Sequence, residues 1–381
     1  MEYKTLCWDD LAVKITLSVF RPEGNKAKEY HVMAQVQDLF LPVEVQFQQL
    51  ESALTRLAGS EEMGGAVLVW KRYFLSDALN QCNLLPQGET AATSIVQQAV
   101  LNGAKVALWA YWVEGAVLSL TSRGSVKMSR PDYDHLYTVQ LHCRQRNEAM
   151  ETYYIFDEYT EELALHDCTL KENCVRTWIY VHGVDVHYQR MANARKAYFE
   201  KEGLTDKTHY IASTGIEGKY IYPDSIVQMD AYAVKGLREG QITFLKGLEH
   251  LSPTIDYGVT FERATAVDYG DRRHIYVSGT GSLNNKSEVV YPGNILKQLS
   301  HSLENVCALL EEGGAGVNDV ALFVVYLRDT ADYERVNDYM NSYYPQVPNV
   351  IVWAPFHRPE LLVQVECIAV KPAENAAFPD F

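Results

Sequence analysis

The last third of the chain has the clearest pattern of apolar and polar positions. The stretch HIYVSGTGSL (274–283) has the composition of a strand and ends in small turn residues. Apolar residues then recur every three or four positions, which predicts a helix that ends at Gly313-Gly314. Its apolar stripe is Ile295, Leu299, Leu303, Val306 and Leu310. A strand (319–329), a helix (332–345) and two further strands (349–356 and 361–370) complete the order β–α–β–α–β–β.

The same order of elements occurs twice earlier in the chain. In the first third, we predict a helix between Pro42 and Gly59, followed by elements at 64–77 (strand), 76–85 (short helix), 93–100 and 104–113 (strands). In the middle third, Phe156, Tyr159, Leu163 and Leu170 mark one helix. A strand (173–185), a long helix ending at Gly203 and a closing strand (225–234) follow it.

The closing strands make the repeat visible in the letters themselves. IVQMDAYAV (226–234) aligns without a gap with LVQVECIAV (362–370), so Gln228 matches Gln364 and Asp230 matches Glu366. Self-similarity of this kind indicates one supersecondary unit used repeatedly. We therefore predict an α/β (α+β) fold of three tandem units, at 1–115, 130–240 and 255–375. Residues 116–135 and 236–256 are interpreted as connectors.

Polar residues in the last strand raise the question of chemistry. Strand side chains alternate between two faces, so Gln364 and Glu366 lie side by side in a strand that otherwise looks buried. A buried carboxylate is costly unless it is paired. Glu366 is thus either a proton donor with a raised pKa or a partner in a structural ion pair, and Gln364 either orients a ligand or makes a sheet contact.

Composition and charge exclude several classes of protein. A formal net charge of −15 disfavours sequence-independent binding to nucleic acid or to an anionic membrane. No apolar run approaches the roughly 20 residues of a membrane span, and the N-terminus lacks the apolar core of a signal peptide. The seven cysteines are odd in number and show no CxxC spacing, which favours free thiols in a reducing cytoplasm.

No metal or cofactor site is expected. His182 and His187 lie near one another, as do His166, Cys168 and Cys174, but their spacing matches no zinc motif. The glycine-containing turns match neither GxGxxG nor GxxxxGK[ST], so no nucleotide loop is predicted.

Five short motifs carry a resemblance to a known family. They are RTW (176–178), STGIEG (213–218), TFERA (260–264), VSGTGS (277–282) and HRPELLVQVE (357–366). Their order and spacing resemble the RidA/YjgF (L-PSP) family, whose fold is a sheet backed by two helices and whose members usually form homotrimers. The second and third units look more like the chorismatases, which hydrolyse chorismate. The resemblance implies a monomeric pseudo-trimer of three fused units, with the first unit degenerate.

The resemblance also implies a ligand and the residues that would bind it. The ligand would be a small cyclic carboxylate between the second and third units. Arginine forks match carboxylates bidentately, and turn amides bind anions. The predicted binding residues are Arg176, Tyr210, Ser213, Thr214, Gly215, Arg263, Ser278, Gly279 and Arg358. Glu366 would be the catalytic proton donor and Gln364 its orienting partner.

Two departures from the family pattern leave other functions open. Imine deaminases of this family carry an arginine on the strand before the last, and NVIVWAPF (349–356) has none. The family acid at the position of Gln364 is an amide here, and an amide is not a general acid. The alternative is a non-catalytic ligand-binding or scaffold protein. A ribonuclease function is disfavoured by the acidic charge.

Overall fold

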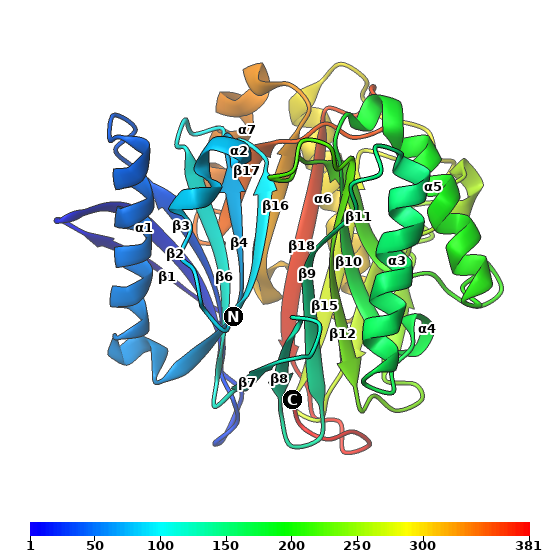
Figure 1. The fold of residues 1–381 in the computed structure, drawn as a ribbon, viewed down its shortest axis with the longest axis horizontal. Helices are drawn as coiled ribbons and strands as arrows, with labels where there is room; N and C mark the ends of the chain where they lie inside the picture. The colour runs from blue at the N-terminus through cyan, green and yellow to red at the C-terminus, as the bar shows by residue number, and fades with distance from the viewer.

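The computed structural model describes the backbone of residues 1–381 and every side chain except that of Tyr257. The described strands form three six-stranded sheets, one from each third of the chain. Figure 1 shows the sheets side by side, with α1 and the α3–α5 pair on the outside. The predicted α/β (α+β) class and the threefold internal repeat are confirmed.

The first sheet has the strand order β1-β2-β3-β6-β4-β5. Its strands are β1 (Glu2–Trp8), β2 (Leu11–Phe20), β3 (Glu29–Val36), β4 (Ala66–Leu75), β5 (Ala92–Gln97) and β6 (Val106–Glu114). Helix α1 (Val43–Ala58) covers one face and α2 is a single turn (Ala78–Gln81). As predicted, α1 begins after Pro42 and ends at Gly59, and its apolar stripe is buried.

The second sheet has the order β11-β10-β12-β9-β8-β7. Its strands are β7 (Val117–Leu120), β8 (Val126–Ser129), β9 (Asp134–His142), β10 (Cys174–Val181), β11 (Ala212–Glu217) and β12 (Val227–Lys235). Its helices are α3 (Glu148–Ala164), α4 (Leu170–Asn173) and α5 (Val184–Lys201). The prediction that Leu170 shares a helix with Phe156 is wrong, because α3 ends at Ala164 and Asp167 has a positive φ of 56° between the two helices.

The third sheet has the order β13-β14-β15-β18-β16-β17. Its strands are β13 (Ile242–Leu245), β14 (Ala264–Asp268), β15 (Arg272–Gly281), β16 (Val320–Leu327), β17 (Asn349–Trp353) and β18 (Val363–Pro372). Helices α6 (Ile295–Glu312) and α7 (Tyr333–Tyr343) complete it. Single 3₁₀ turns occupy Glu61–Met63, Cys82–Leu84, Thr254–Tyr257, Val317–Asp319 and Thr330–Asp332.

The two predicted connectors are wrong. Residues 116–135 contain β7 and β8, and residues 236–256 contain β13; these strands belong to the second and third sheets. The strands β7 and β13 are short, lie at sheet edges and keep much of their surface in water. A four-residue edge strand is too short to show the alternation of apolar and polar positions that marks a strand, which is why the pattern did not reveal it.

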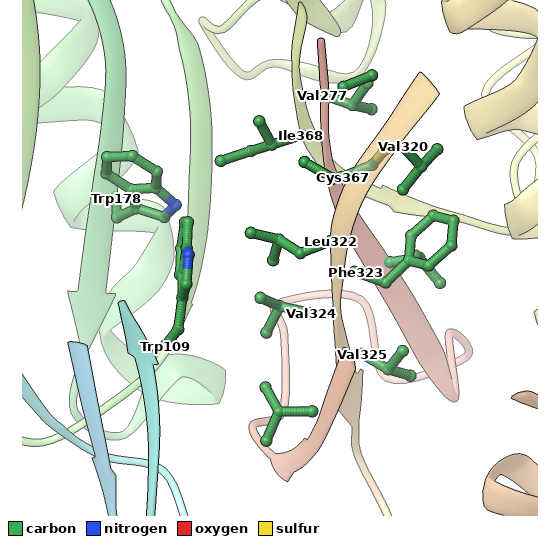
Figure 2. Close-up of a cluster of buried hydrophobic side chains, with 14 of the residues drawn as sticks. Trp109, Trp178, Val277, Val320, Leu322, Phe323, Val324, Val325, Cys367 and Ile368 are labelled. Atoms are coloured by element: carbon green, nitrogen blue, oxygen red, sulfur yellow. The ribbon is translucent and has the colours of Figure 1, made fainter. Parts of the chain in front are cut away.

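The closing strands occupy equivalent places in the three sheets. Each of β6, β12 and β18 lies between the strand that follows the unit's first long helix and the strand that precedes that helix. Figure 2 shows the packing between sheets: Leu322, Val324 and Ile368 point toward Trp109 and Trp178 of the other two sheets. We call the contact between two sheets a seam.

Other sequence expectations concern thiols and membranes. All seven cysteines are free in the structure. Within the described residues, none of the helices is both long and apolar enough to cross a bilayer.

Candidate functional site

Glu366 lies on β18 at the second–third seam and is 1% exposed. Its carboxylate accepts hydrogen bonds from Trp178 Nε1 (2.6 Å) and Thr214 Oγ1 (2.7 Å). It also accepts one from the Tyr326 hydroxyl (3.1 Å) and lies 3.0 Å from Arg176 Nη2. Both carboxylate oxygens are therefore partnered, so this surrounding corresponds to the ion-pair alternative for Glu366 rather than to an accessible acid.

Three predicted binding residues belong to the same buried network. Arg176 donates to Ser278 Oγ at 3.1 Å, and Thr214 Oγ1 accepts from the Gly279 amide at 2.9 Å. Ser278 Oγ in turn accepts from the Ser213 amide at 2.9 Å. Arg176, Thr214 and Ser278 are all at most 2% exposed. Arg176, Thr214 and Ser278 join the second and third sheets, and none of the three lines the cleft that opens beside this network.

The equivalent acid of the second unit has the same kind of partner. Asp230 on β12 is fully buried and lies 3.2 Å from Arg72 Nη2 on β4, across the first–second seam. The oxygens of Asp230 also accept hydrogen bonds from Ser94 Oγ (2.5 Å) and from the backbone N–H of Gln140 (2.9 Å). The repeated acids on the closing strands, Asp230 and Glu366, thus each form an ion pair across a seam. The matching residue of β6 is Trp109.

A cleft opens in front of the second–third network. We call it the arginine cleft. It is lined by Tyr188, Ser213, Gly215, Phe261, Arg263, Gly279, Gly281, Leu283, His357, Arg358, Leu361 and Gln364. Six of the eleven predicted site residues therefore meet here: Ser213, Gly215, Arg263, Gly279, Arg358 and Gln364. Its volume is small, about 30 Å³.

Two arginines line the arginine cleft. Arg263 precedes β14 and is 3% exposed, and its Nε and Nη2 donate to the Ser252 carbonyl at 3.3 and 2.9 Å. Arg358 lies in the loop before β18 and donates to the Ser287 carbonyl at 2.9 Å. No aspartate or glutamate is among the described residues that line this cleft. Its charge is therefore positive in a protein whose overall charge is −15.

Glycines bring the backbone close to the cleft side chains. A Cβ at Gly279 would lie 2.9 Å from Gln364 Oε1 and 3.1 Å from the Thr214 methyl group. A Cβ at Gly215 would lie 2.9 Å from the Tyr188 ring. Such distances are shorter than van der Waals contact, so only glycine fits at these two positions without displacing the lining.

Sequence reasoning missed three aromatic groups of the arginine cleft, Tyr188, Phe261 and His357. The rings of Tyr188 on α5 and His357 are stacked, with centroids 4.1 Å apart and an interplanar angle of 5°. Burial, together with the nearby Arg358, lowers the pKa of His357 to about 4, so its imidazole is neutral at pH 7. The helical spacing of Tyr188 indicates only a core position. The signal for His357 was its place directly before Arg358 in HRPELLVQVE.

Tyr210 lies outside the arginine cleft. It lines a neighbouring hollow of about 70 Å³ with Thr205, His209, Lys246 and Glu262. Arg263 lines both spaces. Among the described side chains, no group of three or more histidine, cysteine or acidic residues is placed to hold a metal ion.

Comparisons with known proteins identify the family and the fold. The Endoribonuclease L-PSP family matches residues 263–371. A RutC family protein of Pyrococcus abyssi is 31% identical over 99 residues, which is 26% of this chain and 78% of the relative. The 3-aminoacrylate deaminase RutC of Acinetobacter baylyi is 30% identical over 97 residues, 25% of this chain and 77% of the relative.

A solved chorismatase has the same fold along most of the chain. The two structures superpose with a TM-score of 0.65 at 16% sequence identity, covering 82% of this chain and 96% of the chorismatase. Because the chain contains most of a RutC relative at 31% identity and has three sheets of one design, it belongs to the RidA/RutC (L-PSP) family, as a protein in which three units are fused.

Proposed function

We propose that the arginine cleft binds a small cyclic carboxylate of the chorismate type. The observation that carries the proposal is the meeting of Arg263 and Arg358 in one cleft that has no acidic lining residue among those described. Two arginines in one cleft suit a ligand with two carboxylates. Ser213, the amide of Gln364 and the glycine backbone add uncharged hydrogen-bonding groups for the ring substituents.

Binding is better supported than hydrolysis. Cleavage of an enol ether needs a proton donor, and the carboxylate of Glu366 is covered by Trp178, Thr214 and Tyr326. His357 faces the cleft, but a pKa near 4 makes it a poor acid at neutral pH. The shared chorismatase fold keeps hydrolysis as the second candidate.

Ligand entry requires the cleft to widen. Its volume of about 30 Å³ holds little more than water. We infer that the loop before β18 moves on binding, because Arg358 is held to the Ser287 carbonyl by a hydrogen bond that a carboxylate can replace. We therefore expect Arg358 to leave Ser287 and pair with the ligand.

The test is to measure chorismate binding by calorimetry and pyruvate release in the same samples. Binding without pyruvate supports the proposal, and Arg358→Ala is then expected to weaken binding about tenfold or more. The matched control is Arg123→Ala, which removes an exposed arginine paired with Glu161 and should leave binding unchanged.

Other results would point elsewhere. Pyruvate release that disappears in Glu366→Gln would establish the hydrolase. Absence of binding to chorismate and to other cyclic dicarboxylates would overturn the proposal and leave the scaffold alternative.

A further inference from the structure

A second cleft lies at the third–first seam, and its chemistry is different. It has a volume of about 260 Å³ and is formed by β2, β3 and the residues before β6 on one side and by α7 and β17 on the other. These elements are the repeat equivalents of those around the arginine cleft. We call it the amide cleft, because most of its polar lining is asparagine and glutamine.

The side chains that face the amide cleft follow from strand and helix periodicity. On β2, Val13, Ile15 and Leu17 are buried in the core under α1, so Lys14 and Thr16 point the opposite way, into the cleft. On α7, Asn337 and Asn341 are four residues apart and therefore share one face of the helix.

Part of the amide lining is already hydrogen-bonded to the protein, across the seam or within one unit. The Gln35 side chain donates to the Asn349 carbonyl at 2.8 Å, which ties β3 to β17. The Asn102 side-chain oxygen accepts from the Ala104 amide at 2.9 Å. Asn349 lies on β17, the strand on which the family's deaminases carry an arginine, and the cleft receives no guanidinium group from its described lining.

Other polar groups of the amide cleft have no partner among the described residues. The side chains of Asn337 and Asn341 make no hydrogen bond there, and the Lys14 ammonium forms no ion pair. No acidic side chain lines the cleft in the described part of the chain. The site thus presents one positive charge and several groups that both donate and accept hydrogen bonds.

An open cleft is not an automatic result of the repeat. At the first–second seam the corresponding space is filled, because Gln140 bonds to the Thr93 carbonyl and to the Tyr220 hydroxyl. Gln228 also donates to the Ile95 carbonyl at 2.9 Å. The amides of that seam bond to protein, whereas those of α7 face solvent in a hollow.

We propose that the amide cleft is a binding site for a hydroxyl-rich small molecule with a single anionic group, such as a sugar acid or a sugar phosphate. Each hydroxyl both donates and accepts, as each side-chain amide does, so the two are complementary. Lys14 binds the anionic group as a point charge. The ring of Tyr333 and the side chains of Val347 and Ile351 give apolar surface for the carbon face.

The experiment uses the whole protein and three probes: gluconate, glucose 6-phosphate and glucose. Titrations are followed by calorimetry and by amide NMR shifts. We expect at least one of the two anionic probes to bind with a dissociation constant of about 1 mM or tighter, and glucose to bind more weakly. Gluconate and glucose 6-phosphate distinguish a carboxylate from a phosphate as the anionic group.

Variants then locate the site. Lys14→Met is expected to weaken the anionic probe about tenfold, and Asn337→Ala with Asn341→Ala to weaken all probes. Asn193→Ala, which removes an exposed asparagine of α5, is the control for the helix change. Arg358→Ala in the arginine cleft should change nothing, so failure here is independent of the first proposal.

Two results would overturn the proposal. One is the absence of saturable binding by all three probes. The other is binding that Lys14→Met and the asparagine pair leave unchanged, because the probe would then occupy a different site.

Discussion

The second–third and third–first seams differ in where their buried ion pair lies. At the second–third seam, Arg176 and Glu366 meet directly behind the arginine cleft. At the third–first seam, Arg272 of β15 pairs with Glu29 of β3. Glu29 is opposite Val113 near the far end of β6, whereas the residue equivalent to Glu366 is Trp109. Each seam, including the first–second one with Arg72 and Asp230, is thus joined by one buried pair.

The two clefts differ in volume as well as in the position of the buried ion pair. With the pair and its hydrogen bonds behind it, the arginine cleft holds about 30 Å³, and the amide cleft, with no such pair behind it, holds about 260 Å³. Removing a buried partner leaves an uncompensated charge, so these pairs fix how neighbouring sheets dock. The repeat therefore uses one device, which lies behind the narrow arginine cleft and away from the wider amide cleft.

Breaking the pair behind the arginine cleft should have the largest effect. Glu366→Ala leaves Arg176 without its counter-ion and removes the acceptor of Trp178 and Tyr326. We expect a loss of about 3–5 kcal/mol in the free energy of unfolding, measured by denaturant titration. The control is Glu161→Ala, an exposed pair with Arg123, which should cost less than about 1 kcal/mol. Equal losses in the two variants would show that the seam pair does not stabilise the fold.

Much of the fold was predictable because its long elements are strongly periodic. Helix α1 has both its proline start and its glycine end in the sequence, and the helices and strands of the third unit alternate cleanly. The strands that precede the first long helix of each unit were the difficult part, and of these only β15 was predicted. The strands β7, β8 and β13 have only four residues each, which is too short for an alternating pattern to separate them from a loop, although each pairs with a strand next to it in the sequence.

The sequence predicted the location of the candidate site better than the roles of its residues. Six residues chosen from motifs converge on one cleft, but Arg176, Thr214, Ser278 and Glu366 form one buried network. A strand pattern shows that an acid is buried, yet its partner comes from a strand nearly 190 residues away, in another sheet. The same limit hides the amide cleft, whose lining comes from the first and third units.

Acid should lower the free energy of unfolding because two buried histidines, His31 and His135, resist protonation in the folded protein. Burial lowers the pKa of His31 and of His135 to about 3. Between pH 6.5 and pH 3 the unfolded chain therefore takes up protons that the folded chain does not, and stability falls as the pH falls. The expected slope is about 1.4 kcal/mol per pH unit for each histidine.

The variant for this test is His31→Gln, whose side-chain oxygen can still accept from Trp109 Nε1. We expect the unfolding free energy of this variant to fall less steeply with falling pH between pH 6.5 and pH 5 than that of the wild type, because unfolding takes up about one proton fewer. His250→Gln, which replaces an exposed histidine, is the control. An unchanged slope in His31→Gln would mean that His31 is protonated in the folded protein. Burial also pushes the pKa of Glu29 upward, but His274 and Arg272 lower it below its usual range, so the third–first pair should persist through this window.

Filling the space beside Gln364 should have a moderate effect. Gly279→Ala places a methyl group 2.9 Å from Gln364 Oε1 and 3.1 Å from Thr214. We expect a loss of about 1–3 kcal/mol in unfolding free energy, typical of overpacking, and weaker binding in the arginine cleft. Gly316→Ala is the matched control, because its added methyl group would have no neighbouring atom within 4 Å and its φ is not positive. Similar stabilities for the two variants would show that the lining yields to a methyl group at no cost.

The smallest effect on stability is expected from Arg358→Ala, which should make the arginine cleft resemble the wider amide cleft. Arg358 is half-buried, lines the cleft and donates one hydrogen bond to the Ser287 carbonyl. Losing a rim contact should change the unfolding free energy by about 0.5 kcal/mol or less. Hydrogen exchange should nevertheless become faster at the amides of residues 284–288, since that loop loses its tie to the segment before β18. Unchanged exchange in this loop, with unchanged stability, would show that the seam network alone, and not Arg358, keeps the arginine cleft narrow.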